Sequence, residues 1–290
     1  MPVPTITTLL PHHGGDPFCL APSGLCLQHP ALAACPWLVH GFSLRNRVSR
    51  DHPLPGASSF EQSGEDVKSV PIQNAFVTSL AGNTMVLVRL RQCHSDGVVC
   101  LDRLAPGDLP AEGDAVITRR SGVLLAVQVA DCLPVLIVDK SKRILAAVHA
   151  GWRGLLAGVV PKTLEAMQSR YASDPRHCLA VIGPSIGPCC YQVGQDVAMP
   201  FEEAFPGRPQ LWRNFQPAGR DLSSGTGPPD ARRMLDLSAA CRCQLETAGL
   251  PARGVFSHPP CTSCHRDVFY SYRADGESTG RMLAAIGKIH

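Results

Sequence analysis

The chain has 290 residues, 44% of them hydrophobic and 18% charged, which is typical of a globular protein large enough to bury a core. Its net charge of +3 comes from scattered basic residues and argues against nucleic acid as a partner, and no apolar stretch reaches the ~18 residues of a membrane span. Thirteen cysteines at irregular spacings, with no signal-peptide pattern before them, indicate reduced thiols and a cytoplasmic protein.

The first half of the chain is predicted to be rich in strands. Residues 1–36 are proline-rich, include the pair His12-His13 and show little periodicity, so we expect a peripheral segment followed by one domain over 37–290. Residues 49–70 are polar and are expected to form a loop. Short β-branched runs between turn residues predict strands at 84–90, 115–118, 123–129, 134–138, 144–148 and 178–182.

Helical spacing dominates the second half. It predicts a helix over 155–171, in which Pro161 marks either a bend or a late start, and further helices over 194–205, 234–248 and 280–288. Residues 207–230 are rich in Pro, Gly and Ser, as expected for a surface excursion. No internal repeat is visible. The pattern predicts one compact mixed α/β domain and leaves the order of its layers open.

The stretch Val148-His149-Ala150-Gly151-Trp152-Arg153-Gly154 joins an apolar run to a second one and predicts a strand, a tight turn and a helix. Such a junction can aim backbone N–H groups at an anion. Here it also carries an imidazole that can bind a metal, on His149, and a guanidinium, on Arg153. We therefore expect chemistry at this junction.

Two other potential metal ligands, His94 and Cys132, each lie beside a predicted strand, as His149 does. The three are too far apart in sequence for a zinc finger, so only the fold can bring them together. Two His and one Cys leave one position of a tetrahedral Zn²⁺ open, as a catalytic zinc requires. Two alternatives stay open: Cys132 is a nucleophile oriented by His149, or these residues are ordinary core residues.

Several longer motifs point to one family. The chain resembles the laccase-domain, or polyphenol-oxidase-like, purine nucleoside phosphorylases from about residue 38 to about residue 282. The motifs that carry the resemblance are His40-Gly41-Phe42-Ser43-Leu44-Arg45, Ala130-Asp131-Cys132-Leu133-Pro134, His149-Ala150-Gly151-Trp152-Arg153-Gly154, Gly183-Pro184-Ser185-Ile186-Gly187-Pro188-Cys189-Cys190-Tyr191 and Phe269-Tyr270-Ser271-Tyr272-Arg273-Ala274-Asp275-Gly276.

The resemblance implies a single α/β domain, a layered α–β sandwich of mixed sheets flanked by helices, with zinc held by His94, Cys132 and His149. It implies phosphorolysis of adenosine, inosine and guanosine with inorganic phosphate as co-substrate. Methylthioadenosine phosphorolysis and adenosine deamination are associated with the family, and its older name implies copper-dependent oxidation of phenols.

Roles for single residues follow from the motifs. Arg153 and Arg45 are candidates to bind phosphate, each with the alternative of pairing with a structural carboxylate. Asp131 either orients a histidine or caps a turn. Tyr191 either stacks on a base or packs in the core. The residues expected to contact substrate are His40, Ser43, Gly151 and Tyr191.

The sequence argues against covalent haem and against a multicopper cluster. Cys261-Thr262-Ser263-Cys264-His265 matches the pattern for covalent haem, but the N-terminus shows no export route, so we expect a loop that donates Cys261 and Thr262 to a pocket wall or the core. The chain has 11 histidines and no His-x-His pair, so it cannot build a multicopper cluster by the usual means. A single copper at the triad remains an alternative to zinc.

The chain departs from the family pattern at three positions. Ser95 replaces a usual Gly, Leu44 a usual Thr and Ala274 a usual Arg. Ser95 and Leu44 are near the expected site and put rate and substrate preference in question. Ser95 and Ala274 keep open a non-enzymatic regulator that binds another protein, whose identity the sequence does not predict.

Overall fold

Two six-stranded mixed sheets form the centre of the molecule, seen in a computed structural model that describes residues 15–45, 69–82, 84–103, 108–214 and 233–289. The first sheet runs in the order β1 (Cys19–Leu20), β2 (Cys26–Gln28), β3 (Leu38–Ser43), β15 (Met282–Lys288), β7 (Val123–Val129), β4 (Val86–Arg89). The second runs in the order β14 (Val255–Phe256), β10 (Cys178–Ile182), β8 (Leu133–Asp139), β9 (Ile144–Ala150), β6 (Ala115–Thr118), β5 (Val98–Cys100). A small third sheet has the order β11 (Gln192–Val193), β13 (Arg233–Leu235), β12 (Trp212–Asn214).

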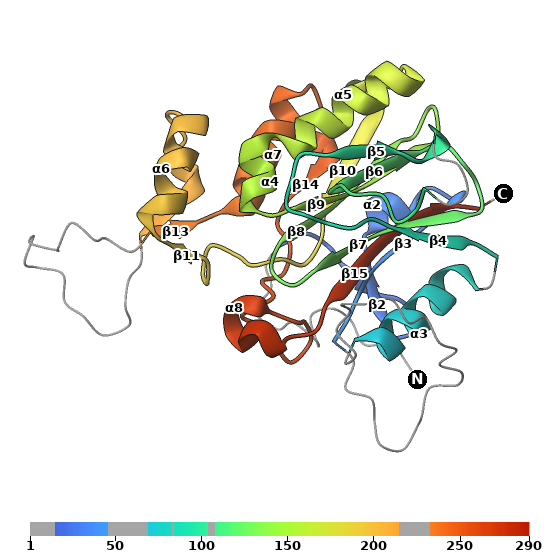
Figure 1. Ribbon diagram of the computed structural model, residues 1–290, viewed down its shortest axis with the longest axis horizontal. Coiled ribbons are helices and arrows are strands. Elements are labelled where there is room, and N and C mark those ends of the chain that lie inside the picture. The colour runs from blue at the N-terminus through green and yellow to red at the C-terminus, as the bar shows by residue number, and fades with distance from the viewer. Residues whose placement is uncertain (1–14, 46–68, 83, 104–107, 215–232, 290) are drawn as a thin grey trace, which may run out of the picture.

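Helices lie around the sheets (Figure 1). They are α2 (Pro30–Ala33), α3 (Val70–Ala81), α4 (Trp152–Ala157), α5 (Val159–Tyr171), α6 (Gln195–Ala204), α7 (Leu237–Thr247) and α8 (Tyr272–Asp275). Short 3₁₀ helices lie at Leu101–Arg103, Pro175–His177, Pro209–Leu211, Ala252–Gly254 and Gly276–Ser278.

The two large sheets pack face to face, and each outer face is covered by helices. Phe42, Leu125 and Ile286 of the first sheet meet Leu136 and Val181 of the second in one buried cluster. A second cluster joins the outer face of the second sheet to α5 and α7, and a third joins the outer face of the first sheet to α3. Figure 1 shows α5 and α7 on the side opposite α3. The layered α–β sandwich expected from the family resemblance is therefore confirmed.

The register of the second sheet places the residues of the expected site together. In the β8–β9 pair, Leu133 lies opposite Ala150. Cys132, just before β8, therefore meets Gly151, just after β9, at this end of the sheet. In the β6–β9 pair Ala115 lies opposite Val148, which brings Asp114 beside His149. The predicted strand, glycine turn and helix at this junction are confirmed as β9, Gly151 and α4.

Two predicted helices are wrong in whole or in part. The predicted helix over 280–288 is instead the strand β15, Met282–Lys288, buried between β3 and β7. The run Met282-Leu283-Ala284-Ala285-Ile286 has high helix propensity, but burial on both faces in a central strand overrides it. The predicted helix over 234–248 begins only at Leu237, after an Asp236 N-cap whose carboxylate accepts from Ala239 N at 2.9 Å.

The predicted helix over 155–171 is interrupted at Gly158 rather than at Pro161. Gly158 has φ of 82°, a left-handed conformation that ends α4 and begins α5. Pro161 then lies in the first turn of α5, where its missing N–H group has no intrahelical partner to lose.

The described part of the N-terminal segment is not peripheral. Phe18, Leu27 and Leu32 are fully buried, and β2 pairs with β3. These strands have two and three residues around a Pro22-Ser23-Gly24 turn, too short to show a periodicity in sequence. His12-His13, most of the predicted loop over 49–70 and residues 215–230 of the predicted excursion lie outside the described residues.

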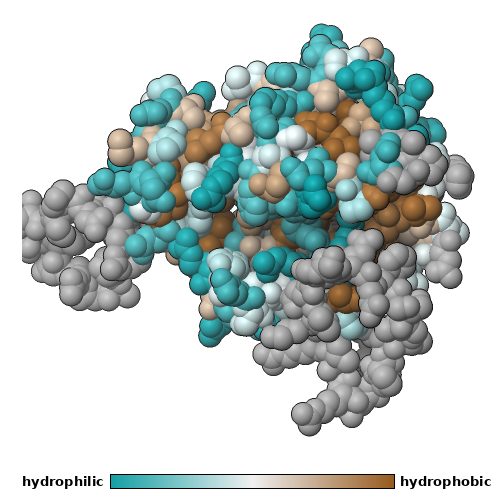
Figure 2. Space-filling view, viewed as in Figure 1, coloured by the Kyte–Doolittle hydropathy of each residue, from teal (hydrophilic) through white to brown (hydrophobic). Residues whose placement is uncertain are grey.

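The surface agrees with the balanced composition. Figure 2 shows polar residues interspersed with apolar ones across the coloured part of the visible face. Among the residues that the structure describes, no helix combines the length and apolar character needed to cross a membrane.

Candidate metal centre

The donor atoms of His94, Cys132 and His149 converge to within 4.8 Å of one another. His94 lies on the connection from β4 to β5 and Cys132 on the connection from β7 to β8, so both connections pass from the first sheet to the second. The Cys132 sulfur lies 3.9 Å from His94 Nε2, and the two imidazole rings are 4.8 Å apart at 82°. His94 is exposed and His149 buried, so the centre has one side open to solvent.

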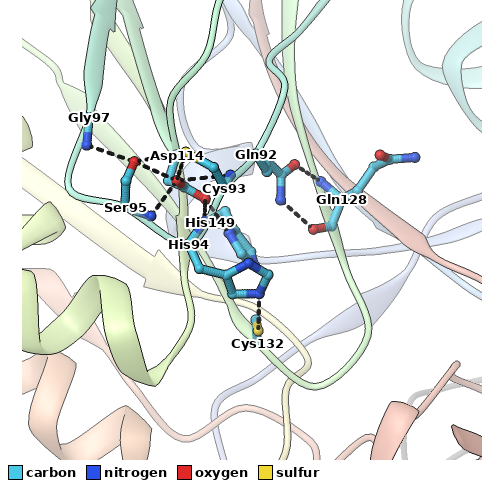
Figure 3. A network of polar contacts seen from close by, with 9 residues as sticks. All are labelled: Gln92, Cys93, His94, Ser95, Gly97, Asp114, Gln128, Cys132 and His149. Carbon is cyan, nitrogen blue, oxygen red and sulfur yellow. Dashed lines mark hydrogen bonds and ion pairs between the residues drawn. The ribbon is translucent and has the colours of Figure 1, made fainter. Parts of the chain in front are cut away.

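The residue that orders this centre is Asp114, which the sequence analysis did not single out. It is fully buried, and its Oδ1 lies 2.7 Å from His149 Nδ1 (Figure 3). The carboxylate also accepts from the backbone N–H groups of Cys93, His94 and Ser95 at 3.2, 3.0 and 2.6 Å. Because Nδ1 of His149 is held by Asp114, its Nε2 is left to face the other two side chains.

Ser95, where the family usually has Gly, adds to this network. Its hydroxyl donates to Asp114 Oδ2 at 2.8 Å and accepts from Gly97 N at 3.1 Å (Figure 3). The replacement therefore strengthens the carboxylate cradle around the loop and places no side chain among the three donor atoms.

Two residues at this centre have strained backbones. His94 has φ of 59° and Asp131 has φ of 86°, both in the left-handed region that costs a non-glycine residue roughly 1–3 kcal/mol. Asp114 holds His94 in place, and Gln92 anchors the same loop to the first sheet through reciprocal bonds with Gln128 of 2.9 and 2.7 Å. Strain that the surroundings fix in this way is typical of functional sites.

Electrostatics favour the thiolate of Cys132. Burial opposes ionisation, but hydrogen bonds and charge from His149 and His94 outweigh it and lower the pKa of the thiol to about 6. Burial likewise opposes protonation of His149, but Asp114 and the Cys132 thiolate raise its pKa to about 9. The thiolate is the form of cysteine that binds metals or attacks electrophiles. Cys132 therefore suits either expected role, metal ligand or nucleophile.

Gly151 makes room for the convergence. A Cβ atom on this residue would lie 3.1 Å from both Cys132 Sγ and His94 Cδ2. Its φ of −73° suits any amino acid, so the close approach, and not the backbone, calls for glycine here.

Replacing Gly151→Ala is expected to displace the Cys132 sulfur or the His94 ring while leaving α4 intact. We expect zinc affinity and any turnover to fall about 10-fold or more. Zinc titration and circular dichroism measure the two effects. Gly24→Ala adds a Cβ that meets no atom within 4 Å, and although its φ of 70° costs some stability, it should keep wild-type zinc binding. Unchanged zinc affinity in the Gly151 variant would contradict this account.

Asp131 does not orient a histidine. Its oxygens accept from Thr262 Oγ1 at 2.5 Å and from Arg273 N at 2.6 Å. The structure gives the orienting role to Asp114, and Asp131 instead ties the Cys132 loop to the C-terminal segments. Thr262 is fully buried, in agreement with its expected place in a wall or core.

Tyr191 lies between the core and the candidate centre. It is half-buried, and burial with the nearby Cys132 thiolate raises its pKa to about 12. The guanidinium of Arg273 lies over its ring, 5.1 Å from the centroid. One face of the phenol is thus already covered by a cation.

The two arginines expected to bind phosphate differ in their surroundings. Arg45 Nη1 pairs with Asp275 at 2.6 Å and donates to the Arg266 carbonyl at 3.1 Å, so it has the structural carboxylate of the alternative reading. Arg153 is exposed and stacks on Trp152, 4.1 Å from the ring centroid. In the described part of the chain Arg153 has no ion-pair partner.

His40 and Ser43 are buried on β3 and bond within the fold. His40 Nε2 accepts from His29 N at 2.9 Å, and burial lowers its pKa to about 4, which keeps it neutral. Ser43 Oγ accepts from Leu283 N at 2.9 Å. The side chains of both residues therefore bond to neighbouring backbone N–H groups, and these bonds do not involve the triad.

The donors fit a catalytic zinc site. Two imidazoles and one thiolate match the residue types of His/Cys zinc sites and leave a fourth position open. The exposed His94 gives that position access to solvent, and Asp114 supplies the carboxylate that usually orients a metal-bound histidine. The same donors accept copper.

Comparison with known proteins finds the family that the sequence motifs resemble. The profile of a family described as multi-copper polyphenol oxidoreductase laccase matches residues 39–288. A purine nucleoside phosphorylase of Deinococcus radiodurans is 35% identical over 269 residues, 92% of this chain and 94% of its own. The purine nucleoside phosphorylase YlmD of Geobacillus stearothermophilus is 37% identical over 176 residues, which span only 60% of each chain.

A second kind of name occurs among the relatives. A protein named an adenosine deaminase, from an unknown prokaryotic organism, is 30% identical over 258 residues, 86% of this chain and 93% of its own. The crystal structure of YlmD from Geobacillus stearothermophilus matches with a TM-score of 0.73 at 29% identity, over 92% of this chain and 97% of that one.

Proposed function

The chain belongs to the multi-copper polyphenol oxidoreductase laccase family, and on that basis we propose that it is a zinc-dependent purine nucleoside phosphorylase. The family match confirms the resemblance expected from the motifs. The proposed reaction converts adenosine, inosine or guanosine and phosphate into free base and ribose 1-phosphate, with methylthioadenosine as a further substrate. Relatives named purine nucleoside phosphorylase over most of the chain support this choice.

The convergence of His94, Cys132 and His149 under Asp114 is the observation that carries the proposal. A bound zinc would act as a Lewis acid and would acidify a ligated water. Its ligands would be the buried His149, held in one tautomer by Asp114, the half-buried thiolate of Cys132, and His94 on the solvent side. Asp114 keeps a full negative charge because its pKa is lowered by His149 and Ser95 despite burial.

Arg153 is the proposed phosphate ligand. It follows His149 by four residues on the same β9–α4 junction, is exposed, and has no ion pair within the described residues. A guanidinium binds phosphate through charge-assisted hydrogen bonds and would hold it beside the sugar carbon that phosphate attacks. Tyr191, close to Cys132 and Arg153, is the candidate to contact the base.

The deciding experiment supplies inosine to zinc-loaded protein with and without phosphate. We expect hypoxanthine and ribose 1-phosphate in equal amounts, with a rate that rises with phosphate and then saturates. Release of hypoxanthine and free ribose at a rate independent of phosphate would contradict phosphorolysis. Loss of product in a His149→Ala protein that still folds would link the reaction to the candidate centre.

Adenosine deamination is the second candidate, because one relative bears that name. Adenosine separates the two reactions, since phosphorolysis yields adenine and deamination yields inosine and ammonia. We propose deamination as a side activity of the same centre, so His149→Ala should abolish both products. Retention of one product alone would place the two activities at different sites.

Arg153→Ala is expected to raise the KM for phosphate about 10- to 100-fold, because charge-assisted hydrogen bonds contribute about 1.5–3 kcal/mol. The KM for inosine should change much less. Arg176→Ala removes an exposed arginine whose partner is Asp174 and should leave both constants unchanged. A normal phosphate KM in the Arg153 variant would move the phosphate site elsewhere.

We propose that copper bound at the triad would be a substitute for zinc. Oxygen uptake that persists after removal of free copper would argue instead for the polyphenol oxidation in the family name. All 13 cysteines are free thiols, which suits the reducing cytoplasm that we propose as the location.

A further inference from the structure

Four cysteine sulfurs form a second cluster that the proposed reaction does not use. Cys189 and Cys190 come from the loop after β10, and Cys261 and Cys264 from the segment after β14. Their Sγ atoms all lie within 4.8 Å of one another. The sulfur of Cys264 lies 3.4 Å from that of Cys189 and 3.5 Å from that of Cys190.

Backbone contacts hold the two loops in this arrangement. Ser185 and Cys261 form a parallel β-bridge, and Gly187 N donates to Cys261 Sγ at 3.2 Å. A Cβ atom on Gly187 would lie 3.2 Å from Cys261 Cβ and 3.3 Å from Cys189 Sγ, so glycine lets the loops approach this closely. The cysteine cluster is thus built by the fold, since its two halves are about 70 residues apart in sequence.

We propose that Cys189, Cys190, Cys261 and Cys264 bind a second zinc ion in a closed tetrathiolate site. Zn–S bonds of about 2.3 Å in a tetrahedron put the sulfurs about 3.8 Å apart, close to the separations seen here. The Cys261-x-x-Cys264 spacing is a common half of such sites.

The charge balance of the cluster also favours a cation. Thiolates within 4.8 Å of one another repel, and a divalent cation bound among them would remove that repulsion.

Four protein ligands leave no open position, so this second zinc is structural. It would fasten the loop that ends at Tyr191 to the segment that contains Thr262. Thr262 in turn donates to Asp131, the neighbour of Cys132. The tetrathiolate zinc would therefore secure one wall of the candidate metal centre without taking part in its chemistry.

Counting zinc in matched variants tests the inference. Purified, chelator-washed wild-type protein is expected to hold about two zinc ions per chain, and His149→Ala about one. In His149→Ala protein the X-ray absorption spectrum of zinc should show four sulfur ligands at about 2.3 Å. Cys264→Ser and Cys189→Ser, both at exposed positions, should each lose one zinc ion relative to the wild type, whereas Cys19→Ser should keep both.

The outcomes separate the two sites. His149→Ala protein that binds no zinc when supplied with Zn²⁺, or whose zinc has nitrogen or oxygen ligands, would overturn the tetrathiolate site. So would a disulfide among these four residues in protein purified under reducing conditions. If only the triad fails to bind zinc, the wild type and His149→Ala will both hold one sulfur-ligated ion. Because the absorption spectrum is measured with all four cysteines intact, the test stands even if a Cys→Ser variant does not fold.

Discussion

Asp114→Asn is expected to lower zinc affinity at the triad about 10- to 100-fold and to destabilise the fold by about 3 kcal/mol. The amide keeps the shape of the carboxylate but loses its charge and one acceptor oxygen. Its NH₂ group would face donors, either the backbone N–H groups of residues 93–95 or the Nδ1–H of His149. Either orientation leaves buried donors unsatisfied and frees His149 to turn.

Another buried aspartate of the second sheet, at the end of β8, provides the control for Asp114→Asn. Asp139 is also fully buried and accepts from Ser141, Lys142 and Ser173. Asp139→Asn should cost similar stability but keep the zinc affinity and turnover of the folded protein. Zinc competition titrations and urea unfolding measure the two quantities separately. Equal zinc affinity in both variants would show that Asp114 has only a structural role.

Gly183→Ala is expected to destabilise the protein by about 3 kcal/mol, the upper part of the range for overpacked cores. The added Cβ would lie 2.1 Å from Cε1 and 2.2 Å from Cδ1 of Phe42. Phe42 is buried between the two sheets, so it cannot swing into solvent. Gly183 itself is held by the bond from its N–H to the Pro134 carbonyl at 2.9 Å, and one of the two residues has to shift.

Shortening the aromatic side chain tests the cause. Phe42→Leu alone should be mildly destabilising, but in the Gly183→Ala background it should restore part of the lost stability. Chemical unfolding of the two single variants and the double variant gives the coupling energy. Strict additivity of the two changes would rule out the steric conflict as the source of the loss.

Four strands of the second sheet, β6, β8, β9 and β10, could be predicted because their sequence and burial agree. The run 133–139 is apolar on both faces, as a central strand covered on both sides requires. β15 was missed because Ala, Leu and Met favour helix, and only its pairing with β3 and β7 makes it a strand. β3 and α3 were also missed, the first hidden within a motif and the second beginning at the edge of a polar segment.

The part of the candidate site that depends on residue type and on motifs could be predicted from the sequence. His94, Cys132 and His149 combine metal-binding chemistry with positions beside strands, and the structure brings them together. Asp114 gave only the weak signal of a Gly113-Asp114 pair before a strand, because its importance arises from the β6–β9 register. His40 and Ser43 lie in a family motif, yet their side chains bond within the first sheet.

Two of the triad residues, His94 and Cys132, lie on connections between the two sheets, and His149 lies in β9 of the second sheet. This placement has a mechanical consequence. An ion held by His94, Cys132 and His149 would cross-link the two sheets and oppose the sliding of one sheet over the other. Through mass action it would also add about 2.7 kcal/mol to the unfolding free energy when free zinc is 100-fold above its dissociation constant. The melting temperature should then rise with zinc supply, so catalytic readiness and resistance to heat would depend on the same ion.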